Sequence, residues 1–132
     1  MRTLGAAFLM ASVSAFAGLP LIDPHVAFVA TGGFWEFGPD RGQFRVVVTN
    51  HGWEHVISKV ELQWLLEDVA ARDLRLHKSV EVAELSGGLM SVGQPTFTSG
   101  GNVVLHANLK TGESTVFFLT PLQPGMYRIE VQ

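Results

Sequence analysis

The chain has 132 residues, three tryptophans, no cysteine and a formal net charge of −3 at pH 7. A chain of this length forms one domain, and without cysteine that domain contains neither a disulfide nor a thiol nucleophile. The mildly acidic charge excludes the basic surface that nucleic-acid binding requires. The composition therefore favours a single domain held together by its apolar core.

The N-terminus has the pattern of a secretory signal. A short positive start precedes the uncharged run 4–17, which ends in Ala15 and Ala17, the small residues that a signal peptidase requires. We predict a signal peptide over 1–17 and a domain over 18–132, located in the periplasm or outside the cell. Cleavage would leave no transmembrane span and would remove Arg2, which makes the net charge −4.

A retained membrane anchor is the alternative. No charged residue lies between Arg2 and Asp23, and a run of that length can span a bilayer. Pro20 and the small-residue cleavage site favour removal of the segment instead.

Beyond the signal, apolar and polar residues alternate with a period of two, which places one face of a strand on a core and the other in water. Turn-forming residues separate the alternating runs. The runs cover 44–49, 60–67, 74–82, 103–109 and 129–131, with turns at 38–42, 50–52, 111–113 and 121–125. This pattern predicts an all-β sandwich of about seven to eight mostly antiparallel strands.

The segment 61–78 fits two structures. Leu62, Leu65, Leu66 and Val69 have helical spacing, but the alternation continues on both sides and no clear helix cap is present. We therefore expect two strands joined around residues 68–73.

The glycine- and serine-rich segment 86–102 predicts a long loop, with one short strand near 96–98. We expect two of its apolar residues, Met90 and Phe97, to pack under the sheet.

Two stretches resemble known domains. "LQPGMYRIEV" at 122–131 resembles the proline- and tyrosine-containing corner of fibronectin type III and related immunoglobulin-like domains. "FRVVVTNHG" at 44–52 resembles the second strand of bacterial CARDB-type domains and of bacterial proteinase inhibitors. Trp64 occupies the place where such sandwiches often bury an aromatic residue.

The resemblance implies an immunoglobulin-like β-sandwich in which the Tyr127 hydroxyl bonds back to the preceding loop. In a fibronectin type III domain another strand follows the tyrosine strand, whereas this sequence ends at Gln132. Either the segment 26–30 fills that position or one sheet keeps an open edge. Such sandwiches host many activities, so the likeness implies little about function.

His51 and His55 are the candidate metal ligands. Transition-metal sites need three or four converging ligands, and "NHG" at 50–52 predicts a turn, where a spacing of four does not bring two imidazoles together. We expect no metal site here and no cofactor. The alternative is a periplasmic metal-binding protein that uses these two residues with another histidine.

The motifs of common enzymes do not occur in the sequence. It contains no G-x-S-x-G, no cysteine and no glycine-rich phosphate loop before a helix. Its only tyrosine is assigned to the corner of the sandwich. We therefore predict a chain that is not an enzyme.

Two regions are candidates for partner binding. The run 116–119 is apolar on both faces, so Val116 and Phe118 either are covered within the domain or contact a partner, and Arg128 and Glu130 would protect an open edge beside them. If that edge is exposed, we expect a partner strand to bind it, and proline at 128 or 130 to block the partner while leaving the fold.

The second region is the aromatic pair Trp35 and Phe37, with Phe34 on the opposite face. From both regions we predict an exported, non-catalytic protein-binding or structural domain whose partner is another exported or cell-envelope protein.

Overall fold

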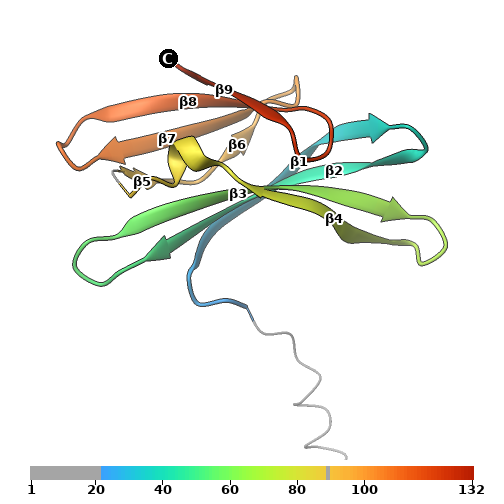
Figure 1. The fold of residues 1–132 in the computed structure, drawn as a ribbon, viewed down its shortest axis with the longest axis horizontal. Coiled ribbons are helices and arrows are strands. Elements are labelled where there is room, and N and C mark those ends of the chain that lie inside the picture. The colour runs from blue at the N-terminus through green and yellow to red at the C-terminus, as the bar shows by residue number, and fades with distance from the viewer. Residues whose placement is uncertain (1–21, 89) are drawn as a thin grey trace, which may run out of the picture.

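The computed structural model describes residues 22–88 and 90–132, which form a sandwich of two antiparallel β-sheets (Figure 1). One sheet has four strands in the order β1-β2-β3-β4, and the other has five, in the order β5-β7-β8-β9 with β6 paired to β7. The elements are β1 (Val26–Phe37), β2 (Asp40–His51), β3 (Ile57–Asp68), β4 (Asp73–Glu81), the 3₁₀ helix η1 (Ala83–Leu85), β5 (Met90–Val92), β6 (Thr96–Phe97), β7 (Val103–Leu109), β8 (Ser114–Pro121) and β9 (Tyr127–Val131). The predicted all-β sandwich is confirmed, and the short strands β5 and β6 bring the described strands to nine.

The core lies between the two sheets because each central strand directs alternate side chains inward. Phe44, Val46 and Val48 of β2 are buried, and so are Leu105 of β7 and Leu119 of β8. These residues belong to one hydrophobic cluster, so neither sheet has a core of its own.

Trp64 of β3 is fully buried in this cluster, as its alternation predicted. Its ring meets Phe44 edge to face, with centroids 6.0 Å apart and planes at 77°. Its Nε1–H donates to the carbonyl oxygen of Leu122 at 3.1 Å. One side chain of the four-stranded sheet therefore also bonds to the loop before the last strand of the other sheet.

The segment 61–78 forms the expected strand pair, but one detail of its pattern was wrong. Leu74 and Leu76 share a sequence parity with Val80, which in an unbroken strand would place them on the same inner face, yet they are 40% and 53% exposed. A bulge lies between the pairs Trp64↔Lys78 and Leu65↔Leu76 and leaves one extra residue on β4. That extra residue moves Leu74 and Leu76 to the outer face.

The segment 86–102 contains the predicted short strand and a second one, β5 at Met90–Val92, that was not predicted. It contains the short strand β6 at Thr96–Phe97, and Met90 and Phe97 are partly buried against the core.

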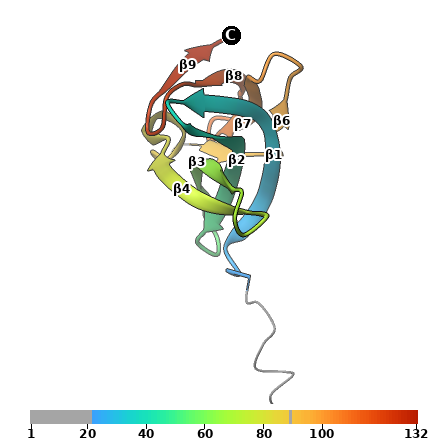
Figure 2. The same ribbon diagram turned by 90° about the vertical axis from the view of Figure 1, so that its right-hand side faces the viewer.

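The edge strands of the two sheets make different contacts on the two sides of the sandwich (Figure 2). On one side β1 lies beside β6, where the Gln94 Nε2–H donates to the carbonyl oxygen of Val29 at 3.3 Å. On the other side lie β4 and β9. There Tyr127 of β9 bonds to Glu84 of η1, the short helix that follows β4. Because β1 pairs with β2 and not with β9, the expected open edge falls on β9.

The strand order differs from that of immunoglobulin domains. There one sheet contains strands A, B, E and D and the other C, F and G, so the chain crosses between sheets repeatedly. Here β1 to β4 lie side by side in sequence order, as do β7 to β9, while β5 and β6 both pair with β7. The described chain changes sheet through η1.

The predicted signal peptide, 1–17, lies outside the described residues. Within 22–88 and 90–132 no helix has the length and apolar character needed to cross a bilayer.

Candidate protein-binding strand edge

The outer face of the five-stranded sheet brings together four of the six residues predicted to bind a partner. Val116 and Phe118 on β8 point away from the core and are half-buried. Phe118 pairs with Glu130 on β9, and Arg128 lies two residues before Glu130 on the same face. We call Tyr127–Val131, with its outward backbone groups, the β9 edge.

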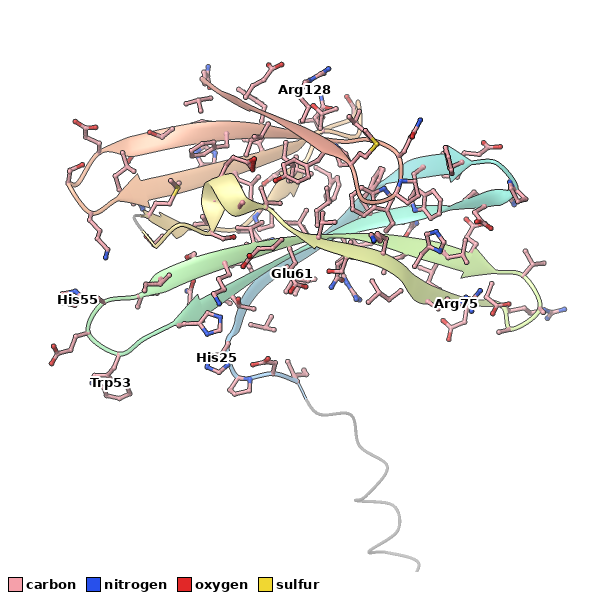
Figure 3. The ribbon with its side chains drawn as sticks, in the orientation of Figure 1. His25, Trp53, His55, Glu61, Arg75 and Arg128 are labelled. Carbon is pink, nitrogen blue, oxygen red and sulfur yellow. The ribbon has the colours of Figure 1, made fainter. Side chains whose placement is uncertain are left out.

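Arg128 and Glu130 form an exposed ion pair on this face. Arg128 Nε lies 3.5 Å from Glu130 Oε1, and the two side chains are 63% and 67% exposed. Figure 3 shows Arg128 directed away from the sandwich. An exposed pair of this kind contributes little to stability, so both charges can face a partner at small cost to the fold.

The backbone of β9 has one free side in the described chain, because β9 pairs with β8 alone. The N–H of Gln132 donates to the carbonyl oxygen of Val116 at 3.0 Å. Since inward and outward backbone groups alternate along an antiparallel strand, Arg128 and Glu130 also bond to β8. The N–H and C=O groups of Tyr127, Ile129 and Val131 therefore face outward.

This register corrects one expectation drawn from the sequence. Proline at 128 or 130 was expected to block a partner while leaving the fold, but the N–H groups of these residues face β8. The position that tests the β9 edge is Val131, whose N–H faces outward and whose side chain is 65% exposed. No pattern in the sequence singles out Val131, because its role depends on how β9 pairs with β8.

Tyr127 does not make the bond that the resemblance implied. Its hydroxyl donates to Glu84 Oε2 at 2.7 Å, across to η1, and not to the preceding loop. Desolvation raises the pKa of the Tyr127 hydroxyl, and the neighbouring Glu84 carboxylate raises it further. Tyr127 and Ile129 are half-buried against the core, which fixes the inner face of β9.

The remaining predicted pair, Trp35 and Phe37, lies elsewhere and is divided between core and solvent. Trp35 is 4% exposed, and its Nε1–H is shared at 3.1 Å between the carbonyl oxygens of Gln43 and Leu65. Phe37, beside the turn at Gly38, is 53% exposed. Trp35 therefore presents little surface to a protein partner, whereas Phe37 is accessible.

A pocket of about 290 Å³ opens near this end of the sandwich. It is lined by Phe34, Trp35, Glu36 and Phe44, by the loop residues 100–102, and by 120–124, where β8 ends and the β8–β9 loop begins. The pocket does not include Phe37.

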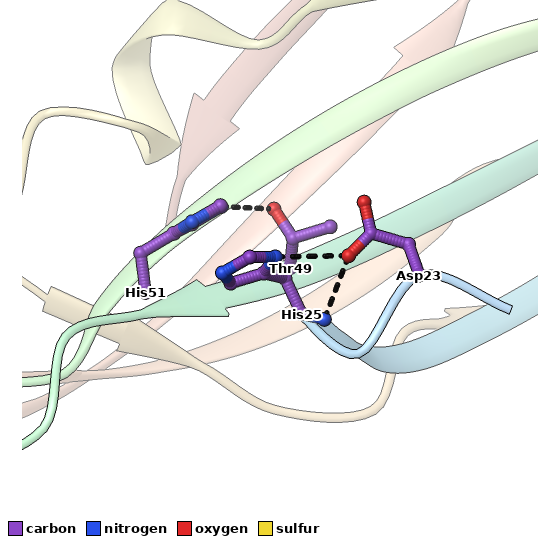
Figure 4. A network of polar contacts seen from close by, with 4 residues as sticks. All are labelled: Asp23, His25, Thr49 and His51. Carbon is purple, nitrogen blue, oxygen red and sulfur yellow. Dashed lines mark hydrogen bonds and ion pairs between the residues drawn. The ribbon is translucent and has the colours of Figure 1, made fainter.

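The histidines adopt an arrangement that the sequence did not predict. His51 stacks on His25, with ring centroids 4.4 Å apart, and its Nε2 lies 3.0 Å from Thr49 Oγ1 (Figure 4). Asp23 Oδ1 accepts the backbone N–H of His25 at 2.8 Å and contacts its Nδ1 at 2.9 Å. These bonds lower the pKa of Asp23, the backbone bond most strongly.

His55 lies apart from this stack, on the exposed β2–β3 turn together with Trp53 (Figure 3). In the described part of the chain no group of three or more His, Cys, Asp or Glu side chains is placed to hold a metal ion. The alternative metal site at His51 and His55 therefore finds no third ligand among these residues.

Comparison with protein-family models, with curated proteins and with solved structures finds no match to this chain.

Proposed function

We propose that this chain is a non-catalytic, exported domain that binds another polypeptide along the β9 edge. The observation that carries the proposal is the outward backbone of Tyr127, Ile129 and Val131 on a strand that pairs only with β8 in the described chain. A polypeptide in extended conformation can add to such an edge by main-chain hydrogen bonds.

The neighbouring side chains supply the specificity that backbone bonds lack. Val116 and Phe118 offer half-buried apolar surface next to the edge, and Arg128 and Glu130 offer one charge of each sign. A partner strand would set alternate side chains against these positions.

The absence of catalysis is part of the proposal. The two described groups with clearly shifted pKa values are Asp23 and Tyr127, and each shift follows from a hydrogen bond or burial within the fold. Asp23 contacts His25, Tyr127 bonds to Glu84, and neither group lines the pocket beside Trp35.

The immunoglobulin-like type is proposed at the level of architecture. Two packed antiparallel sheets and a fully buried Trp64 on the third strand support it. The sequential order of β1 to β4 in one sheet and of β7 to β9 in the other, together with the Tyr127–Glu84 bond, sets this chain apart from the common immunoglobulin topology.

The location follows from the signal-like start of the sequence. We propose that the domain acts in the periplasm or outside the cell, with a partner from the same compartment. The net charge of −3 favours a protein partner over nucleic acid.

The test compares Val131→Pro with Val131→Ala. Proline removes the outward N–H of Val131, whereas alanine truncates the same exposed side chain and keeps the N–H. A photo-crosslinking residue at Gln132, which is exposed on the same face as Glu130 and leaves both charges in place, is added to each variant. Mass spectrometry of the envelope fraction then identifies the partner and the segment that contacts β9.

We expect crosslinks to one identified protein in the wild type and in Val131→Ala, and their loss in Val131→Pro with an unchanged unfolding midpoint. Equal crosslinking by Val131→Pro and Val131→Ala would refute the β9 edge as the binding site.

A further inference from the structure

We infer that the β9 edge accepts a second copy of this chain, through antiparallel pairing of β9 with β9 about a two-fold axis at Ile129. The inference rests on the proposed function, because it names the occupant of the same edge. What carries it is the sequence Tyr127-Arg128-Ile129-Glu130-Val131, which complements itself when read in the opposite direction.

The backbone register permits this pairing. A two-fold axis at Ile129 places Ile129 opposite Ile129 of the second copy and Tyr127 opposite Val131. These are the three residues whose N–H and C=O groups face outward, so each facing pair can exchange hydrogen bonds as an antiparallel ladder requires.

The same axis sets opposite charges against each other. Arg128 of each copy lies across from Glu130 of the other, in a non-hydrogen-bonded pair with Cα atoms about 4.5 Å apart. Cross-strand pairs of opposite charge at this spacing are favourable. Both side chains are more than 60% exposed in the single chain, so neither is engaged in the core.

Other registers lose this complementarity. An axis at Arg128 would place two arginines face to face, and an axis at Glu130 would place two glutamates face to face, which is unfavourable. A parallel pairing in register would also align like charges. An axis at Tyr127 or Val131 would leave a shorter overlap of the two strands.

The inner face of the paired strands supports the same register. Val131 is 65% exposed in the single chain, and it would lie across from the half-buried ring of Tyr127. The two Ile129 side chains would meet on the axis. Pairing would join the two five-stranded sheets into one, a closed arrangement in which both copies use the same surface.

The experiment measures the mass of the purified exported protein by sedimentation equilibrium over a wide concentration range. We expect a concentration-dependent dimer, because one short strand from each copy gives a small interface. Arg128→Glu leaves two acidic residues on β9 and Glu130→Arg leaves two basic residues. Each variant alone should dimerise roughly tenfold or more weakly, because both cross-strand charge pairs become repulsive.

Mixing the two variants is the decisive step. Arg128→Glu in one copy faces Glu130→Arg in the other, so an equimolar mixture should form a heterodimer of wild-type affinity. The double variant, Arg128→Glu with Glu130→Arg, should regain the homodimer. Glu113→Arg, on the exposed β7–β8 turn, is the control for a change of net charge and should dimerise as the wild type does.

Two outcomes overturn the inference: a wild type that stays monomeric throughout, or single variants whose mixture gives no recovery. Either leaves the proposed function to be judged separately, because mass spectrometry of the crosslinks shows whether the captured chain is another exported protein or a second copy. If the crosslinks that Val131→Pro loses join only two copies of this chain while the charge variants follow the expected pattern, the edge binds its own copy and the heterologous partner is refuted.

Discussion

Trp64 connects the two sheets by its ring and by its indole N–H, which makes it the single residue with the largest expected effect on stability. Trp64→Ala should lower the free energy of unfolding by about 3–5 kcal/mol, the range for removal of a large buried aromatic side chain. Denaturant unfolding measures the loss, and Trp64→Phe, which keeps an aromatic ring and deletes the N–H, should lose less.

Trp53 provides the matched control because it is 95% exposed on the β2–β3 turn. Trp53→Ala should change the free energy of unfolding by no more than about 0.5 kcal/mol. A loss below about 1 kcal/mol for Trp64→Ala would contradict its central position in the core.

Tyr127 gives the second prediction at this scale, because it is the only tyrosine and can be titrated directly. Its pKa is raised by desolvation and then by Glu84. A raised pKa in the folded state means that the contribution to stability is complete below the pKa of the unfolded chain and is lost as pH rises through the folded pKa. The ultraviolet absorbance of tyrosinate should therefore appear at a higher pH in the folded protein than in denaturant.

Glu84→Gln should move this titration to lower pH without abolishing the upward shift, because desolvation is the larger cause. Tyr127→Phe should cost only about 0.5–1 kcal/mol, since the bond ends on an exposed carboxylate that water can solvate when the hydroxyl is gone. A folded-state titration that coincides with that of the denatured chain would rule out the Tyr127–Glu84 contact.

At the scale of elements, Gly42 shows why β2 and β3 approach so closely. A Cβ at this position would overlap the carbonyl oxygen of Leu65, which is one of the two acceptors of the Trp35 N–H. Gly42→Ala should destabilise the fold by about 3 kcal/mol or more, because backbone atoms of a central strand must shift.

Gly87→Ala is the matched control, because the added Cβ meets no atom within 4 Å and the backbone needs no left-handed conformation there. Its unfolding midpoint should equal that of the wild type or exceed it slightly. Equal stability of Gly42→Ala and Gly87→Ala would show that the two strands separate at Gly42 without cost.

The strands could be predicted because alternation is a local property, written in residues such as Phe44, Val46 and Val48. The β4 bulge could not be predicted, because one extra residue changes the pairing of β4 with β3 without changing the sequence pattern within β4. The same limit applies to the β9 edge. Arg128 and Glu130 stand out in the sequence as charges on a short strand, but the outward N–H of Val131 follows from its register with β8.

For the whole molecule, the shared core has a consequence for unfolding. Leu62 and Trp64 of one sheet pack in the same cluster as Leu105 and Leu119 of the other. The chain contains no cysteine, so no disulfide can hold either sheet once this cluster opens. A sheet that loses its facing layer exposes its apolar side to water, and we therefore expect both sheets to unfold together in one transition.

The distribution of aromatic residues allows a direct measurement of this coupling. The buried tryptophans Trp35 and Trp64 both belong to the four-stranded sheet, and the single tyrosine, Tyr127, belongs to the other. In a Trp53→Phe background, which removes the exposed tryptophan, indole fluorescence reports one sheet and tyrosine absorbance reports the other. The two signals should change with the same midpoint and slope in urea. A tyrosine transition that is complete before the tryptophan signal moves would mean that the five-stranded sheet opens first, with the four-stranded sheet stable without it.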